Sequence, residues 1–182
     1  MTFTVLDIPE VILIEPDLFR DARGFFLEVY HRLRYAEHGI PDEFVQDNHS
    51  ASVEGVLRGL HYQIRQPQGK LVHVLQGEIF DVAVDLRCRA ATFGRWVGRT
   101  LTAGRHGQMW IPPGFAHGYL VLSDRAEVAY KVTDYYAPEW ERVLRWDDPT
   151  VGIRWPLEAG QVPILSERDA RGSLLAAAET FP

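Results

Sequence analysis

The chain has 182 residues, long enough for one domain with a substantial core, and 46% of them are hydrophobic and 24% charged, as in an ordinary globular protein. Its net charge of −6 excludes general nucleic-acid binding, and no apolar run is long enough for a membrane-spanning helix. A lone cysteine, Cys88, excludes an internal disulfide and a cysteine-based zinc site, and no secretory signal is visible, so we expect a cytoplasmic protein with residues 1–182 in one domain.

The N-terminal half consists of short β-branched or aromatic segments separated by Gly, Pro or Asp, a pattern typical of an all-β sandwich or barrel. Residues 11–14 and 25–30 are predicted strands, joined through the turn residues 21–24. A short helix is predicted from His31 to Gly39, where the glycine would end it.

The clearest predicted hairpin joins a strand at 71–75 to a strand at 78–85 through the Gln76–Gly77 turn. Further strands are predicted at 109–111, 119–122 and 127–132. Helical periodicity is found only at 166–178. The whole pattern predicts a β-sandwich or barrel with a few short helices.

Arg58, His61 and Lys70 lie close together in strand-like sequence. Cations on rigid strands indicate a preorganised anion pocket, and a histidine among them indicates proton transfer near neutral pH. The simpler alternatives are a hydrogen-bonded structural His61 and a solvated turn Lys70. Arg58 and His61 point to opposite faces of a regular strand, so both can serve one pocket only if Gly59 marks a bulge or kink.

Three further residues allow a structural and a chemical interpretation. Tyr130 shares a strand face with Val128 and Val132, so its ring points inward, for packing or for proton donation. Asp169 follows Ser166 at the spacing of a helix cap. Arg23 lies in a predicted turn, where an arginine side chain is usually exposed to solvent.

A metal site is not expected. The segment from Pro112 to His117 resembles the Pro-x-Gly-x-x-His motif of metal-dependent β-barrels, but the accompanying His-x-His is missing because Tyr62 and Gln63 follow His61. We therefore predict no metal, and we keep a metal-dependent cupin oxygenase as a rival.

Several blocks, taken together in this order, resemble the dTDP-4-dehydrorhamnose 3,5-epimerase family over roughly residues 7–170. The blocks are residues 21–28, 45–50, 55–63, 69–72, 82–87, 92–96, 110–118, 146–149 and 165–169. The resemblance implies a mainly β, cupin-like double-stranded β-helix (jelly-roll) barrel with short helices in its N- and C-terminal parts. It further implies a homodimer without cofactors that inverts C3 and C5 of dTDP-4-dehydro-6-deoxy-D-glucose in dTDP-rhamnose biosynthesis.

By the same resemblance, His61 is the base, Asp169 orients it, Tyr130 is the acid, and Lys70 is the cation near the C4 oxygen. The resemblance also implies a set of residues that hold the nucleotide and pyrophosphate: Arg23, Phe26, Glu28, Gln46, Asn48 and Arg58. The first three of these would reach the site of the neighbouring subunit. His117 and Tyr136 match further substrate-binding positions of the pocket.

Departures from the family pattern are few: His73 stands where Arg is common, and Tyr119 where Phe is common. The Ala-rich tail after Arg171 is not placed by the resemblance. Two alternatives remain: a mono-epimerase that inverts only C3 or only C5 in another sugar pathway, and a sugar-nucleotide-binding barrel without catalysis. The apparently intact acid–base pair favours the enzyme.

Overall fold

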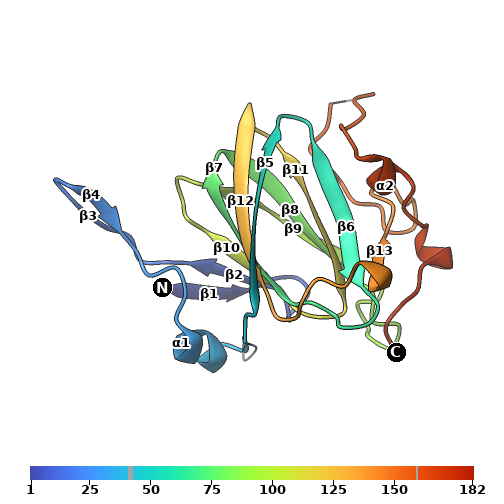
Figure 1. Cartoon of the computed structure of the whole chain (residues 1–182), viewed down its shortest axis with the longest axis horizontal. Coiled ribbons are helices and arrows are strands. Elements are labelled where there is room, and N and C mark those ends of the chain that lie inside the picture. Colours follow the sequence, from blue (N-terminus) through green and yellow to red (C-terminus); the bar gives the residue numbers. More distant parts are fainter. Residues whose placement is uncertain (41–42, 159) are drawn as a thin grey trace.

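The computed structural model describes residues 1–40, 43–158 and 160–182, in which two β-sheets pack face to face (Figure 1). The larger sheet has the strand order β1–β2–β10–β7–β12–β5, with bounds Thr2–Val5, Ile12–Glu15, Gln108–Ile111, Lys70–Gln76, Arg125–Val132 and Gln46–Val53. The second sheet has the order β13–β6–β11–β8–β9, with bounds Glu141–Val143, Leu57–Gln63, Phe115–Val121, Glu78–Asp85 and Trp96–Thr102. The predicted mainly β, cupin-like barrel is confirmed.

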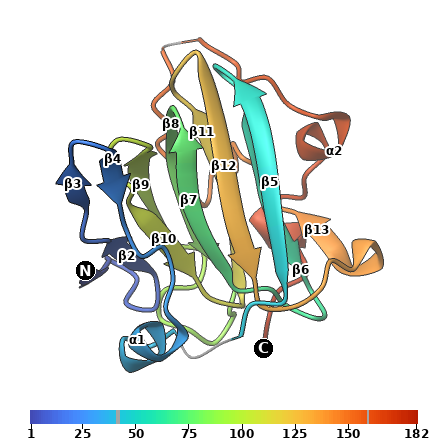
Figure 2. The same ribbon diagram turned by 60° about the vertical axis from the view of Figure 1, so that its left-hand side comes forward.

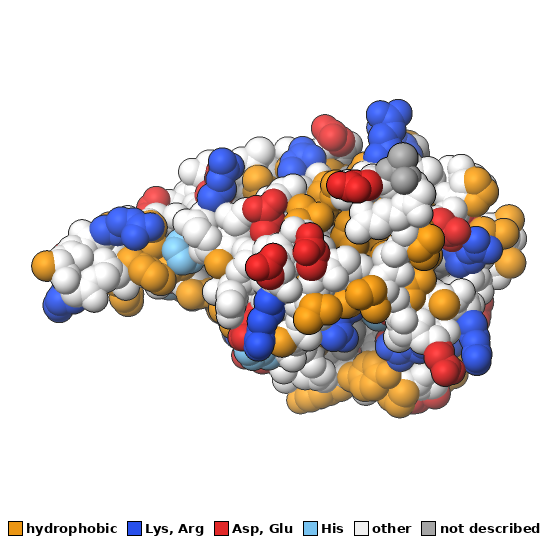
Figure 3. Space-filling view, turned by 90° about the horizontal axis from the view of Figure 1, so that it is seen from above, with side chains coloured by type: hydrophobic (Ala, Val, Ile, Leu, Met, Phe, Trp, Pro, Cys, Tyr) orange, Lys and Arg blue, Asp and Glu red, His pale blue; other side chains and the backbone are white. Residues whose placement is uncertain are grey.

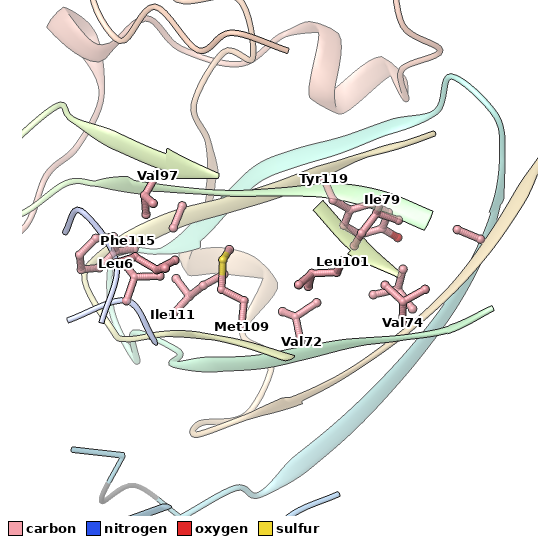
Figure 4. Close-up of a cluster of buried hydrophobic side chains, with 14 of the residues drawn as sticks. Leu6, Val72, Val74, Ile79, Val97, Leu101, Met109, Ile111, Phe115 and Tyr119 are labelled. Atoms are coloured by element: carbon pink, nitrogen blue, oxygen red, sulfur yellow. The ribbon is translucent and has the colours of Figure 1, made fainter. Parts of the chain in front are cut away.

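Apolar side chains fill one end of the space between the two sheets. Val72 and Met109 of the larger sheet face Ile79 and Leu101 of the second sheet, and all four are buried (Figure 4). Each is one of the inward residues that alternate with outward ones along a strand. Burial of such a side chain stabilises the fold by about 1.5–3 kcal/mol.

The short helices lie outside the two sheets (Figure 2). Helix α1 (Arg32–Glu37) begins at His31, whose side chain caps it, and is followed by Gly39 at a φ of 85°, so the predicted helix is confirmed. Its buried Tyr35 packs against the larger sheet beside Trp110. The remaining helical segments are η1 (Pro138–Trp140), α2 (Glu167–Ala170) and η2 (Leu175–Ala177). Within the described residues, no helix has the length and apolar character needed to cross a membrane.

Residues 171–182, which we call the C-terminal strap, cover the outer face of the second sheet. Ser173 bridges to Leu144, and Phe181 bridges to Arg87 further along the sheet. Leu175 is buried in the apolar cluster on this outer face. Because the strap covers its outer side, strand β8 is buried on both faces, which explains why it carries Val82 and Val84 outward and Ile79 inward.

The predicted hairpin between 71–75 and 78–85 is wrong, although both strands exist. β7 belongs to the larger sheet and β8 to the second, so the chain crosses between sheets at Gly77. This glycine has a φ of 78°, and a Cβ there would lie 2.1 Å from the carbonyl oxygen of Arg125. Local sequence shows a turn, but it does not show with which strand each arm pairs.

The predicted strand at 25–30 ends early. A hairpin of β3 (Phe19–Asp21) and β4 (Gly24–Phe26), which we call the arm, occupies this region, so the turn joins β3 to β4 and does not join the 11–14 strand. Beyond Phe26, the carbonyl of Val29 accepts hydrogen bonds from the side chains of Tyr35 and Gln108. Here side-chain donors satisfy a backbone carbonyl that a neighbouring strand would satisfy in the predicted longer strand.

Helical structure at 166–178 is also shorter than predicted, because α2 ends at Ala170. After it, Gly172 lies so close to Arg145 that a Cβ would be 2.9 Å from the Arg145 backbone nitrogen. Ser173 then bonds to the Val143 carbonyl, which holds the chain extended against the second sheet before η2. The apolar residues of this segment therefore face the sheet from a strap and not from one helix.

Candidate active site

A cavity of about 320 Å³ opens between the two sheets, beyond the apolar end of the barrel. Its walls carry polar, charged and tyrosine side chains, all of which can donate or accept hydrogen bonds. The lining residues are Gln46, Asn48, Ser50, Arg58, His61, Tyr62, Gln63, Gln68, Lys70, His117, Tyr119, Tyr130, Tyr136, Glu141 and Arg168.

Strand alternation explains why polar groups converge here. On β5, the inward positions Gln46, Asn48 and Ser50 are polar, whereas Val128 of the neighbouring β12, opposite Ser50, belongs to the apolar core. Tyr130 lies opposite Asn48 in the β12–β5 register, so its ring enters the same space. The barrel interior thus changes from a core to a site along the same strands.

Gly59 allows Arg58 and His61 to serve this one cavity. It has a φ of 119°, and the pairing of β6 with β11 changes register between His117 and Tyr119, opposite this glycine. A Cβ at Gly59 would lie 2.6 Å from the Cα of Gly118, so the two strands approach too closely for any side chain. The predicted kink is confirmed.

His61 is held from outside the cavity by Asp169. Its Nε2 lies 2.6 Å from Asp169 Oδ1, across a sequence separation of 108 residues. Burial raises the pKa of the Asp169 carboxyl, but the hydrogen bond and charge of His61 and the Ser166 hydroxyl together keep that pKa below its usual value. An ionised Asp169 orients the imidazole and leaves the second ring nitrogen to accept a proton.

Asp169 has the predicted capping position as well. Its backbone nitrogen donates to the Ser166 hydroxyl at 3.1 Å, so Ser166 caps α2. The side chain of Asp169 is directed to His61, so capping and pairing use different atoms of one residue.

Lys70 is buried and is not the solvated turn lysine that its spacing suggested. Its Nζ donates to the carbonyl oxygen of His61 at 3.2 Å. Burial lowers the pKa of Lys70 to about 8, while the negative charges of Glu141 and Asp81 oppose this change. At neutral pH the lysine therefore supplies positive charge in a site with little water to screen it.

Tyr130 packs against the apolar core and presents its hydroxyl to the cavity. Burial, and secondarily the neighbouring Tyr119, raise the pKa of its phenol, so it remains protonated and can act as a donor. Tyr119, the departure from the family pattern, is also buried, and its hydroxyl lies 2.8 Å from Ser50 Oγ.

Two charged residues of the cavity, Glu141 and Arg168, were missed by the sequence analysis. They form an ion pair, and the Tyr136 hydroxyl donates to Glu141 Oε2 at 2.7 Å. The backbone of Tyr136 donates to Gln46. Arg168 directly precedes Asp169, which was a usable signal, whereas nothing in the short β13 segment marks Glu141.

His117 lies opposite His61 in the β11–β6 register and is buried. Its Nε2 is 2.7 Å from Oδ1 of Asp81, a further residue that the sequence analysis did not single out. Burial lowers the pKa of His117, so its imidazole is neutral at neutral pH.

The arm residues lie away from this cavity. Arg23 is 90% exposed and bonds to Asp21, and Phe26 is 70% exposed. The arm extends from the body of the molecule with apolar side chains on its surface (Figure 3). Glu28 pairs with Arg34 of α1. Within one chain, none of the three therefore lines the cavity.

Within residues 1–40, 43–158 and 160–182, no group of three His, Cys, Asp or Glu side chains is placed to hold a metal ion. His61 and His117 are instead each paired with one aspartate.

Comparisons with known proteins agree on one family. Residues 5–177 match the family model described as dTDP-4-dehydrorhamnose 3,5-epimerase. The chain is 57% identical to the dTDP-4-dehydrorhamnose 3,5-epimerase of Pseudomonas aeruginosa over 183 residues, which covers 100% of both proteins.

Solved structures of related epimerases have the same fold as this chain. An epimerase from Legionella pneumophila in complex with dTDP-4-keto-L-rhamnose has a TM-score of 0.94 and 52% identity, covering 98% of this chain and 94% of that one. A 3'-monoepimerase from Streptomyces bikiniensis in complex with dTDP-quinovose has a TM-score of 0.86 and 32% identity, covering 94% and 86%.

Replacing Gly59 should damage both the fold and the site. We expect Gly59→Ala to lower the free energy of unfolding by about 2 kcal/mol or more, because the new Cβ meets backbone atoms and the positive φ is strained. Gly104→Ala is the matched control, since no atom lies within 4 Å of a Cβ there. Denaturant unfolding of both variants measures the difference; equal stability would contradict the role given to Gly59.

Proposed function

The chain belongs to the dTDP-4-dehydrorhamnose 3,5-epimerase family, and from this premise we propose how its residues invert C3 and C5 of dTDP-4-dehydro-6-deoxy-D-glucose to give dTDP-4-dehydro-L-rhamnose in dTDP-rhamnose biosynthesis. The observation that carries the assignment of roles is the convergence of His61, Lys70 and Tyr130 on one cavity. No cofactor is required by this chemistry, because a ketone at C4 acidifies the protons on both neighbouring carbons.

His61 is the base. In this assignment it takes the proton from C3 or C5, and the electron pair of that bond moves into the C4 carbonyl to form an enolate. The bond to Asp169 supports the role, since an ionised carboxylate stabilises the imidazolium formed in this step. General-base catalysis by a placed histidine contributes about 10²–10⁴-fold in rate.

Lys70 stabilises the enolate. Its ammonium lies beside the strand that carries His61, so a substrate within reach of the base is also near this charge. A preorganised cation aimed at a developing oxyanion lowers the free energy of the transition state by about 3 kcal/mol in a site that excludes water. Burial of Lys70 supports this role over that of a surface contact.

Tyr130 returns a proton to the other face of the same carbon. It stands on β12 of the larger sheet, whereas His61 stands on β6 of the second sheet, so the two groups approach the cavity from opposite walls. Inversion requires donor and base on opposite faces of the sugar. The exchange of protons with water then restores the phenol and the neutral imidazole.

The polar rim of the cavity holds the nucleotide and pyrophosphate. Arg58 is oriented by a hydrogen bond to Ser52 at 2.9 Å, and its planar guanidinium can form paired bonds to phosphate oxygens. Gln46 donates to Asn48 and accepts from the Tyr136 backbone, which links these three positions into one wall. His117 contributes to the floor of the same site.

A homodimer completes the site. The arm exposes Phe19, Phe25 and Phe26, and an exposed cluster of aromatic rings on a projecting hairpin favours contact with a second subunit. In this arrangement Arg23, Phe26 and Glu28 reach the cavity of the neighbouring chain. We place the enzyme in the cytoplasm, where its exposed free thiol, Cys88, would stay reduced.

Deuterium exchange in D2O tests the reaction and its base. We expect the wild-type enzyme to incorporate deuterium at both C3 and C5, and His61→Asn to lower both rates by about 100-fold or more while dTDP affinity changes little. His49→Asn, at an exposed histidine of β5, is the matched control and should behave as wild type. Exchange at one carbon in the wild type would indicate a mono-epimerase, and a fully active His61→Asn enzyme would contradict the mechanism.

Mixed dimers test the arm. In a 1:1 mixture of Arg23→Ala and His61→Asn subunits, every mixed dimer should contain one intact site, formed by the Arg23→Ala chain and the arm of its partner. At low substrate concentration, random exchange should restore about a quarter of the wild-type activity. If Arg23 instead serves its own chain, the mixture should show only half the activity of the Arg23→Ala parent.

A further inference from the structure

Asp81 places a carboxylate inside the barrel, between two apolar inward residues of β8. It shares its strand face with Ile79 and Ala83, which belong to the core between the sheets. Its exposed fraction is 0%. A carboxylate at such a position loses its hydration and destabilises the fold unless nearby groups compensate its charge.

The hydrogen bonds of Asp81 compensate it only in part. Oδ1 accepts from His117 Nε2 at 2.7 Å, whereas Oδ2 is buried and has no hydrogen-bond partner in the described part of the chain. The imidazole of His117 is neutral, because burial lowers its pKa, so this bond supplies a donor but no positive charge. Arg99 lies opposite Asp81 in the β8–β9 register, but its guanidinium donates to the Gly98 carbonyl.

Lys70 supplies positive charge near this carboxylate. Lys70 donates to the His61 carbonyl on β6, His61 lies opposite His117 of β11 in the strand register, and His117 bonds to Asp81 of β8, so a chain of contacts links the lysine to this carboxylate. The negative charges of Glu141 on β13 and of Asp81 both favour the charged form of Lys70. Glu141 is already bound by Arg168 and Tyr136, so it is largely neutralised. Asp81, with one free oxygen, is the carboxylate whose charge is left for the lysine.

We propose that Asp81 is a positioning residue that acts through its neighbours: its buried carboxylate is the counter-charge that keeps Lys70 an ammonium, and its bond to His117 fixes the orientation of that ring in the floor of the cavity. This inference rests on the proposed function, in which the Lys70 cation stabilises the enolate. It adds a second buried aspartate–histidine pair whose task differs from that of His61 and Asp169.

The sign of the effect follows from charge. Burial already lowers the pKa of Lys70 to about 8, and removal of a negative charge disfavours the ammonium further. Asp81→Asn should therefore lower the Lys70 midpoint by at least about one pH unit, a tenfold change in its acid dissociation constant. About half of the lysine or more would then be neutral at pH 7, and the alkaline limb of the kcat profile should move to lower pH by the same amount.

NMR can read this midpoint directly, because Lys70 and Lys131 are the only lysines in the sequence. In protein labelled with ¹³C-lysine, the Cε signals are assigned with Lys131→Arg and titrated from pH 6 to 11. Asp124→Asn, which removes an exposed carboxylate in the turn after β11, is the matched control and should leave the Lys70 midpoint unchanged. Thermal melting and dTDP binding verify that each variant is folded.

A Lys70 midpoint that stays in place in folded Asp81→Asn would overturn the proposal. His117→Asn gives an independent test, since it removes a neutral ring and leaves the Asp81 charge: the Lys70 midpoint should remain at or above its wild-type value, and a fall of one unit would also overturn the proposal. The NMR titration needs no turnover, so a protein with the predicted shift but without epimerase activity would refute the proposed function alone.

Discussion

The hydrogen bond between His61 and Asp169 is the interaction on which the arrangement of the site depends. It joins β6, in the first half of the chain, to α2, close to the C-terminus, and it buries an ionised carboxylate behind the proposed base. Asp169 can reach His61 because Ser166 caps α2 and because the strap that follows is held against the second sheet. The strap residues do not line the cavity, but the Glu179 carbonyl accepts a hydrogen bond from the lining residue Tyr62, so the strap supports the proposed site from behind and helps to fix one end of this bond.

Burial of charge is the second constraint. The cavity collects ionisable groups at the end of a barrel whose other end is an apolar core, so each group is stable there only with a partner. Asp169 has His61, Glu141 has Arg168, and Asp81 has His117. Burial then sets the protonation states that the reaction needs: it keeps the phenol of Tyr130 protonated and brings the pKa of Lys70 down to about 8 without removing its charge at neutral pH.

From the sequence, the residues that meet in the cavity could be predicted more fully than the pairing of the strands. Strand periodicity identified β7 and β8 and the inward face of Tyr130, because these depend on local alternation. It could not show that the chain changes sheets at Gly77, since strand pairing is decided by distant partners. Resemblance to the family located most of the cavity lining, and Gly59 was recognised as a kink because Arg58 and His61 could not otherwise share a pocket. Burial of Lys70 and the pairing of Asp81 depend on three-dimensional packing and had no local signal.

In the proposed mechanism, base and acid work from opposite walls of the cavity, and Tyr130→Phe followed by NMR in D2O is the most direct test. We expect deuterium still to enter C3 or C5 at a rate within about tenfold of the wild type, because His61 is intact, while formation of the inverted product falls by about 100-fold. Exchange and product formation that fall together at both carbons would contradict this division, since Tyr130 would then be needed for proton abstraction itself.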